Sequence, residues 1–236
     1  MKSSWYHSLK DYIPNDHSRQ VTPDYFLEHL LKRDDSIRLA MDLGCGAGNS
    51  LDYFRRRQPH IQWLGLDIEG SPEVTARTGM GGEFCTYDGS HFPLGDNLFD
   101  LIYCKQVLEH VRYPLALLKE VSRVLKPGGH YIGSTSQLEP YHSYSLWNYT
   151  PYGFCFLMKE AGLQVAEIRP GIDALTLIIR RGLGGPRFFS RWWTHESPLN
   201  LAISLSAKVT GRRAFWTNAV KLLFCGQFCF WAFKQS

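Results

Sequence analysis

The sequence predicts an α/β fold built on a mostly parallel sheet, because short apolar segments alternate with helix-like segments along the chain. A second observation is a glycine-rich turn at residues 44–48, which follows an apolar segment and precedes a helical one. The third is size, since 236 residues with 44% hydrophobic content suit one large domain with a well-filled core.

Helices are expected where the chain shows capping residues, a proline at the first helical position or a one-sided apolar pattern. Thr22 can cap a helix that has Pro23 at its first position, and the segment 126–129, with two glycines, stops the apolar helix before it. The expected helices are 22–33, 49–57, one that begins at 71–73, 114–125 and 150–162.

Strands are expected where short runs are dominated by apolar, β-branched or aromatic residues. A final strand at 226–234 has an apolar run that does not alternate cleanly. A helix through 222–233, docked on the domain or lying on a membrane, is the alternative. The other expected strands are 38–43, 61–67, 83–87, 98–104, 130–135 and 163–168.

The pattern changes after Gly171. Residues 172–223 carry helical periodicity without clear strands, which predicts a helical insertion before the last strand. From Ile172 onward nine basic residues oppose only Asp173 and Glu196, a net charge of +7, so the +4 of the whole chain leaves −3 for the rest. A basic C-terminal third can face an anionic substrate or a membrane surface, and a solvated helix face is the alternative.

The six cysteines form no CxxC pair, and no cluster of Cys and His has zinc-site spacing, so no metal is expected. Most of them lie in apolar stretches, as buried thiols do, which suits a reducing compartment. The first residues lack the apolar run of a signal peptide, and the longest apolar run is shorter than the ~20 residues that span a bilayer. We therefore expect a cytoplasmic protein, with peripheral membrane contact left open.

The glycine turn carries the main functional signal. Asp42, Gly44, Gly46 and Gly48 follow the pattern DxGxGxG, in which alternate glycines allow positive φ and let a ligand lie against the backbone. The N–H groups of the following helix point at such a ligand. A dinucleotide fingerprint is spaced GxGxxG, and an acid at the strand end would repel pyrophosphate, so a dinucleotide dehydrogenase is disfavoured. The same acid suits a positively charged ligand.

Further acids and motifs follow in order. Asp67 ends the second expected strand, Asp88 follows the third, residues 99–111 read FDLIYCKQVLEHV and residues 123–129 read RVLKPGG. Together with the glycine turn, this series resembles the type 11 class I S-adenosylmethionine-dependent methyltransferases from about residue 40 to residue 136. The resemblance implies a Rossmann-like, mostly parallel sheet of seven strands, the last one antiparallel, with helices on both faces.

The resemblance also implies S-adenosylmethionine as methyl donor and S-adenosylhomocysteine as product, without a metal. The glycine turn would pack against the methionine part, Asp42 would hold its amino group, Asp67 the ribose and Asp88 the adenine. Residues 105–108 would form the floor beside the sulfonium, with Lys105 pointing away because a cation there is disfavoured. The full set of expected donor-binding residues is Asp42, Gly44, Cys45, Gly46, Gly48, Asp67, Ile68, Asp88, Gly89, Lys105 and Gln106.

On this basis residues 1–236 form a single methyltransferase domain in four parts. Residues 1–33 are expected to form N-terminal helices and a lid, with His7 folded over the pocket. Residues 34–171 form the donor-binding core. Residues 172–223 form the helical insertion that caps the acceptor, and residues 224–236 the last strand.

A sulfonium is already an activated leaving group, so the protein's main task is to align acceptor and methyl group with water excluded. His110 and His142 are the candidate general bases, because each follows a strand at the carboxyl edge of the sheet, where open α/β sheets bind ligands. A packing role at a helix terminus is the alternative for His110. Whether a base is used at all stays open.

The acceptor is expected to be an O or N atom of a small molecule, such as a secondary metabolite, a sugar or a lipid-linked precursor. No NPPY-like motif and no basic tract indicates nucleic acid. Aromatic residues among the arginines of the insertion suit an anionic, ring-bearing or lipid-linked acceptor. These residues are Phe188, Phe189, Trp192, Trp193 and Trp216.

Two other classes of function remain. A catalytically silent protein of the same fold would bind a partner, bind the donor weakly and tolerate loss of Asp67. A peripheral membrane enzyme acting on a lipid would place Arg212, Arg213, Lys221 and Trp231 near one apolar surface. The sequence does not determine the oligomeric state.

Overall fold

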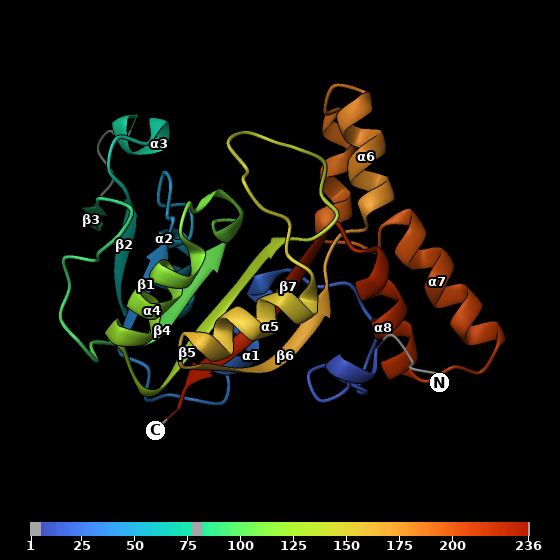
Figure 1. Ribbon diagram of the computed structural model, residues 1–236, viewed down its shortest axis with the longest axis horizontal. Helices are drawn as coiled ribbons and strands as arrows, with labels where there is room; N and C mark the ends of the chain where they lie inside the picture. The colour runs from blue at the N-terminus through green and yellow to red at the C-terminus, as the bar shows by residue number, and fades with distance from the viewer. Residues whose placement is uncertain (1–5, 77–81, 236) are drawn as a thin grey trace.

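The computed structural model describes residues 6–76 and 82–235. Its strands are β1 (Leu39–Leu43), β2 (Gln62–Ile68), β3 (Glu83–Tyr87), β4 (Phe99–Lys105), β5 (Leu125–Ser136), β6 (Leu163–Pro170) and β7 (Gln227–Lys234). They form one seven-stranded sheet with the order β3-β2-β1-β4-β5-β7-β6 (Figure 1). β7 is antiparallel to β5 and β6, whereas the other paired strands are parallel. The predicted fold class is confirmed.

Helices lie on both faces of the sheet. They are α1 (Pro23–Leu31), α2 (Leu51–Arg57), α3 (Pro72–Thr75), α4 (Pro114–Val124), α5 (Pro151–Glu160), α6 (Ala174–Gly182), α7 (Pro198–Val209) and α8 (Ala214–Phe224), with short 3-10 helices η1 (His7–Leu9), η2 (Leu108–His110) and η3 (Arg187–Trp193). α4 and α5 pack into one apolar core, and α1 and α2 into a second core on the opposite face (Figure 1). The helices expected before Gly171 all form, with ends within two residues of those predicted.

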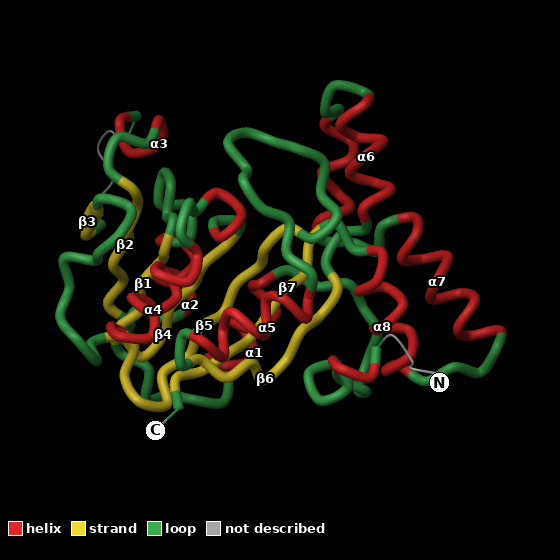
Figure 2. Tube along the Cα trace, in the orientation of Figure 1, coloured by secondary structure: helices red, strands yellow, loops and turns green. Residues whose placement is uncertain are grey.

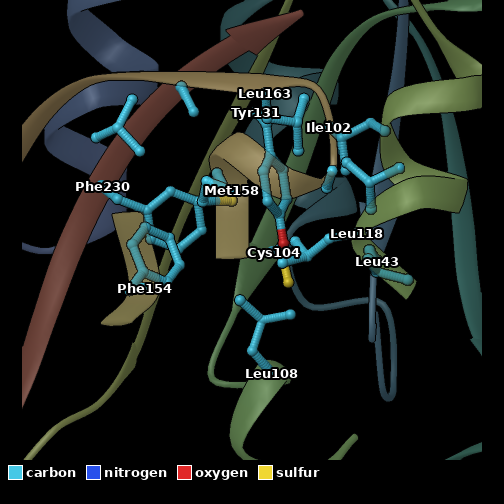
Figure 3. Packing of buried hydrophobic residues seen from close by; sticks show 14 of the residues in the cluster. Leu43, Ile102, Cys104, Leu108, Leu118, Tyr131, Phe154, Met158, Leu163 and Phe230 are labelled. Carbon is cyan, nitrogen blue, oxygen red and sulfur yellow. The ribbon is translucent and has the colours of Figure 1, made fainter. Parts of the chain in front are cut away.

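The larger core lies between the sheet and the helices α4 and α5 (Figure 3). The ring of Phe154 on α5 packs against Phe228 and Phe230 of β7, with centroids 5.2 and 4.6 Å apart. The hydroxyl of Tyr131 points toward the Cys104 thiol (Figure 3). Burial raises the pKa of both groups, so each stays neutral and acts as packing.

The aromatic run in β7 does not alternate because both faces of this strand are covered. Phe228 and Phe230 belong to the core under α5, whereas Cys229 belongs to the core under α1. A strand buried on both faces needs apolar side chains at every position. The predicted last strand is therefore confirmed, and the alternative of one helix through 222–233 is wrong, since α8 ends at Phe224.

β5 begins earlier than the sequence predicts. The segment 126–129 does end α4, but it continues in extended form, so β5 starts at Leu125 instead of His130. Leu125 pairs with Phe99, and a register irregularity before Leu101 lets β4 and β5 stay paired through the glycines.

The chain between β6 and β7 forms the predicted helical insertion, made of α6, η3, α7 and α8 beside the sheet (Figure 2). The N-terminal segment packs against it. The side-chain amide of Asn218 on α8 donates to the carbonyls of Pro14 and His17 at 3.0 and 2.8 Å. The backbone N–H of Ile168 on β6 donates to Tyr12 O at 2.9 Å, which ties the same segment to the sheet edge.

Two buried cations fasten these parts. Arg169 on β6 donates two hydrogen bonds to Asp16, at 2.9 and 2.7 Å, also pairs with Glu167, and lies 4.9 Å over the ring of Tyr25. Lys221 on α8 is fully buried.

Lys221 donates to Ser18 O at 2.6 Å and pairs with Glu196 at 2.8 Å. Trp231 lies in β7, where its indole N–H donates to His130 Nδ1 at 3.2 Å. The expected basic surface containing Lys221 and Trp231 is therefore wrong for these two residues, because tertiary ion pairing and strand pairing take them inside. Within the described ranges, no helix has the length and apolarity needed to cross a membrane.

Replacing Arg169 by Met should lower the free energy of unfolding by about 2–3 kcal/mol, because Asp16 and Glu167 lose the cation they share. The value lies toward the low end for a broken ion pair, since the side chain of Asp16 is half-exposed. Urea denaturation measures the change. Arg19→Met, at an exposed arginine three residues beyond Asp16, is the control, and equal stability of the two variants would contradict the anchoring role of Arg169.

Candidate functional site

The glycine turn after β1 has the conformation that its spacing predicts. Gly44, Gly46 and Gly48 all have positive φ, at 71°, 50° and 81°. Gly44 also lies against Val107, since a Cβ at this position would come within 2.2 Å of Val107 Cγ2. The turn after β1 and the segment after β4 therefore meet at a point where only glycine fits.

A cavity of about 670 Å³ lies between this turn and helix α1. Four carboxylates and two cations line it, so its walls carry an excess of negative charge that suits a cationic ligand. Lys105 is one of these cations and does not turn away from the cavity as expected, because neighbouring acids balance its charge. The charged lining residues are Asp24, Glu28, Asp42, Glu73, Arg57 and Lys105, and Gly44, Cys45 and Gly46 also contribute.

Hydrogen bonds position the acids at the base of this cavity. Asp42 is buried and accepts from the Ser50 hydroxyl, which in turn accepts from the indole of Trp63 at 3.0 Å. The Tyr103 hydroxyl donates to Asp24 at 2.8 Å. Burial raises the pKa of Tyr103 well above its ordinary value, so this hydroxyl remains a donor at neutral pH.

The acids at the ends of β2 and β3 lie outside the residues that line this cavity. Asp67 accepts from the backbone N–H of Gly46 and of Ile68, both at 2.7 Å, so it holds the glycine turn. Asp88 is exposed and accepts from Ser90 and His91 in its own turn, bonds that lower its pKa to about 2.

Ile68 and Gly89 lie side by side next to these acids. Ile68 is exposed, and a Cβ built at Gly89 would approach Ile68 Cδ1 at 3.4 Å. The end of β2 and the turn after β3 thus form a continuous strip. The structure places Asp42 and the first part of the glycine turn on the cavity, and the Asp67–Ile68 and Asp88–Gly89 pairs on this strip beside the turn.

Lys105 and Gln106 connect the large cavity to the ends of β4 and β5. Both residues line a smaller cavity of about 40 Å³ with Ser134 of β5 and Gln227 of β7, and Lys105 also lines the large one. Gln106 has a positive φ of 56°, a rare conformation for a residue other than glycine. The chain turns sharply there, and it continues directly into η2.

Beyond Gln106 lies a cluster of four titratable side chains, Glu109, His110, Glu139 and His142, which we call the polar cluster. The rings of His110 and His142 meet edge to face, with centroids 5.2 Å apart. His142 Nδ1 lies 3.7 Å from Glu139 Oε1. The structure thus brings together both predicted catalytic histidines and adds two carboxylates.

The loop 137–149 is held onto η2 by backbone contacts. Leu146 N and Trp147 N both donate to Glu109 O, at 2.6 and 3.1 Å. The Trp147 indole donates to Val111 O at 2.8 Å, and the Tyr149 hydroxyl donates to Leu108 O at 2.9 Å. These bonds explain why His142, 32 residues after His110, comes to lie beside it.

Glu109 is fully buried, and burial raises its pKa to about 7, with a further contribution from nearby Glu139. Hydrogen bonds from Thr135 at 3.1 Å and Ser136 at 3.3 Å oppose this rise. Burial also lowers the pKa of His110, so its imidazole is neutral at neutral pH. The sequence interpretation missed both glutamates, although Glu109 stands directly before His110 in the segment 99–111.

His7 lies on η1, and its neighbours place it at the outer edge of the sheet. Its segment bonds to β6 through Tyr12, and the ring of the adjacent Tyr6 packs on Phe215 of α8 at 5.6 Å. The cavity is instead closed on this side by Asp24, Leu27 and Glu28 of α1.

Comparison with known proteins identifies the family of the central segment. Residues 41–133 match the family model of the type 11 methyltransferase domain, which confirms the predicted resemblance for this part of the chain. The chain is 28% identical over 143 residues to a ubiquinone biosynthesis O-methyltransferase of Vibrio cholerae, a match that covers 57% of this chain and 56% of that protein. The chain thus spans little more than half the length of this curated relative.

Solved structures share the fold at lower identity. The [4+2]-cyclase SpnF matches with a TM-score of 0.59 and 16% identity, over 93% of this chain and 88% of that one. The 1,6-didemethyltoxoflavin-N1-methyltransferase of Burkholderia thailandensis, solved with S-adenosylhomocysteine, matches with a TM-score of 0.53 and 15% identity, over 91% and 77% of the two chains. Since one of these proteins is named a cyclase, the fold alone does not identify a reaction.

Replacing Gly44 by Ala should destabilise the protein by at least about 1 kcal/mol more than Gly128→Ala, because the new Cβ overlaps Val107. Gly128 is the matched control, since it also has a positive φ, at 77°, but has open space around its Cα. Chemical denaturation measures both variants. Adding Val107→Ala to Gly44→Ala should recover most of the difference, and no recovery would contradict the contact.

Proposed function

We propose that this chain is an S-adenosylmethionine-dependent methyltransferase that moves a methyl group to an O or N atom of a small molecule. One observation carries the proposal: an acid-lined cavity borders the DxGxGxG turn, and the segment after β4 leads from it to a cluster of histidines and glutamates. The family match over residues 41–133 supports the same donor and reaction class.

The residues around the glycine turn fit this donor. S-adenosylmethionine supplies a methyl group that is already activated on a positively charged sulfonium. The turn allows close approach of the methionine part, and Asp42 offers a buried carboxylate for its ammonium group, directly or through water. Lys105 and Gln106 form the floor of the site.

The ribose and adenine would lie on the strip formed by Asp67, Ile68, Asp88 and Gly89. Asp67 uses one hydrogen bond at each of its oxygens, so each oxygen keeps a lone pair for a ribose hydroxyl. Asp88 concentrates its three bonds on Oδ1, which leaves Oδ2 for the adenine amino group. The exposed side chain of Ile68 provides an apolar surface for the base.

The polar cluster would receive the reacting end of the acceptor. An O–H or N–H acceptor that takes a methyl cation must release a proton, and the cluster offers carboxylate and imidazole groups for it. Exposed apolar side chains of the loop 137–149 surround His142 in sequence and suit a ring-bearing acceptor. They are Leu138, Tyr141, Tyr144, Leu146 and Trp147. The name of the Vibrio cholerae relative favours an oxygen acceptor on such a ring.

Binding of S-adenosylhomocysteine tests the donor site. The full chain should bind it with micromolar affinity by calorimetry, and Asp67→Ala should bind at least ~10-fold more weakly, because it loses a charge-assisted hydrogen bond. Asp52→Ala removes an exposed carboxylate on α2 and should bind like the native chain. Native protein that binds no donor would overturn the proposal and favour the catalytically silent alternative.

Methyl transfer to a panel of phenol- and catechol-bearing small molecules tests the acceptor site. For an acceptor that the native chain methylates, His142→Ala should lower the turnover number by roughly 10²-fold or more, as expected when a group that handles the proton is lost. Its affinity for S-adenosylhomocysteine should stay unchanged. His195→Ala, an exposed histidine before α7, is the control. Native-like turnover by His142→Ala would remove this residue from the mechanism.

A further inference from the structure

The polar cluster has the composition and spacing of a metal site. Glu109, His110 and His142 each offer one ligand atom, and these three atoms lie within 4.8 Å of one another. Ligands that share one first-row metal ion at about 2.0–2.3 Å have separations in this range. Two imidazoles and a carboxylate are the donor set that suits zinc and its neighbours in the periodic table.

A charge imbalance inside the cluster also requires a cation or a proton. The Ser136 hydroxyl lies within hydrogen-bond distance of both carboxylates, 3.3 Å from Glu109 Oε1 and 2.6 Å from Glu139 Oε2. With its amide nitrogen turned toward them, Gln106 donates to the same two oxygens at 2.9 and 3.2 Å. Neutral donors alone hold two carboxylates together here, and Glu109 is fully buried.

His142 supplies an independent sign of a missing partner. Its Nδ1 atom is shielded from solvent and has no hydrogen-bond partner in the structure. The nearest carboxylate oxygen, Glu139 Oε1, lies 3.7 Å away, beyond hydrogen-bond distance. A buried ring nitrogen without a partner costs free energy, and a metal ion bound between His142 and the cluster would remove that cost.

We propose that Glu109, His110 and His142 bind one divalent transition-metal ion of the zinc class, with Glu139 beside the site. The surroundings already orient the ligands as metal sites require. Thr135 and Ser136 donate to the Glu109 carboxylate, and a hydrogen bond to the backbone of Tyr144 orients the His110 ring. Three protein ligands leave a position open, as in catalytic zinc sites.

The role of this ion rests on the proposed function, whereas its binding does not. At the open position the ion would bind the acceptor oxygen and favour loss of its proton to Glu139. The oxygen's electron pair then forms the bond to the methyl carbon, while the carbon–sulfur bond breaks and its pair stays on sulfur. The imidazoles would therefore act through the metal and not as free bases.

Titration of the metal-free full-length chain with Zn²⁺ alone tests the site. Calorimetry should show one ion bound per chain with a dissociation constant in the micromolar range or below. His110→Ala and His142→Ala should each weaken binding by at least ~10-fold. His195→Ala, the exposed histidine outside the cluster, should bind like the native chain. Equal affinity in all four proteins would overturn the proposal, and so would the absence of a single strong site.

The visible and ultraviolet spectrum of the Co²⁺-loaded chain identifies the ligands. The spectrum of a nitrogen and oxygen site should appear, without the charge-transfer band of a thiolate. Such a band would overturn the assignment and point to one of the six free cysteines. Melting curves of the metal-free variants check that they fold. Binding of S-adenosylhomocysteine to metal-free protein separates the two proposals, because donor binding without zinc binding overturns only the metal site.

Discussion

The site depends on the way in which Glu109 joins the ends of β4 and β5. Its backbone carbonyl accepts from Leu146 and Trp147, which folds the loop after β5 back over η2, while its buried carboxylate accepts from two hydroxyls at the end of β5. A carboxylate removed from water must be hydrogen-bonded, protonated or paired with a cation. This one residue therefore sets both the shape of the loop and the charge that the loop must accommodate.

The donor and acceptor halves are joined by a separate steric constraint. Val107 occupies the space that a side chain at residue 44 would fill, so the turn after β1 and the segment after β4 lie in direct contact. The positive φ of Gln106 turns the chain from the floor of the donor cavity into η2 within a few residues. The short path means that a ligand on the glycine turn and a molecule at the polar cluster lie on neighbouring strand ends.

The parts that sequence reasoning predicted correctly are those with local causes. The glycine turn needs positive φ at residues that sequence spacing reveals, and the helices before Gly171 carry proline and capping signals in their own first turns. Lys221 and Glu139 could not be placed in this way. Lys221 pairs with Glu196 from another helix, and Glu139 reaches the cluster only because the loop 137–149 folds onto η2. Such contacts depend on tertiary structure and leave no spacing pattern in the chain.

The same distinction explains why a search for metal-ligand spacing found nothing. Zinc motifs are recognised when paired ligands stand a few residues apart, whereas here His142 follows His110 by 32 positions and comes from a different loop. Glu109 and His110 are adjacent, and adjacency alone is common in helical turns. The donor half is thus encoded by a local motif, and the chemistry of the acceptor half depends on what neutralises the buried carboxylates of the polar cluster. A proton there would leave the imidazoles free to act as bases, whereas a cation would occupy them and bind the acceptor itself.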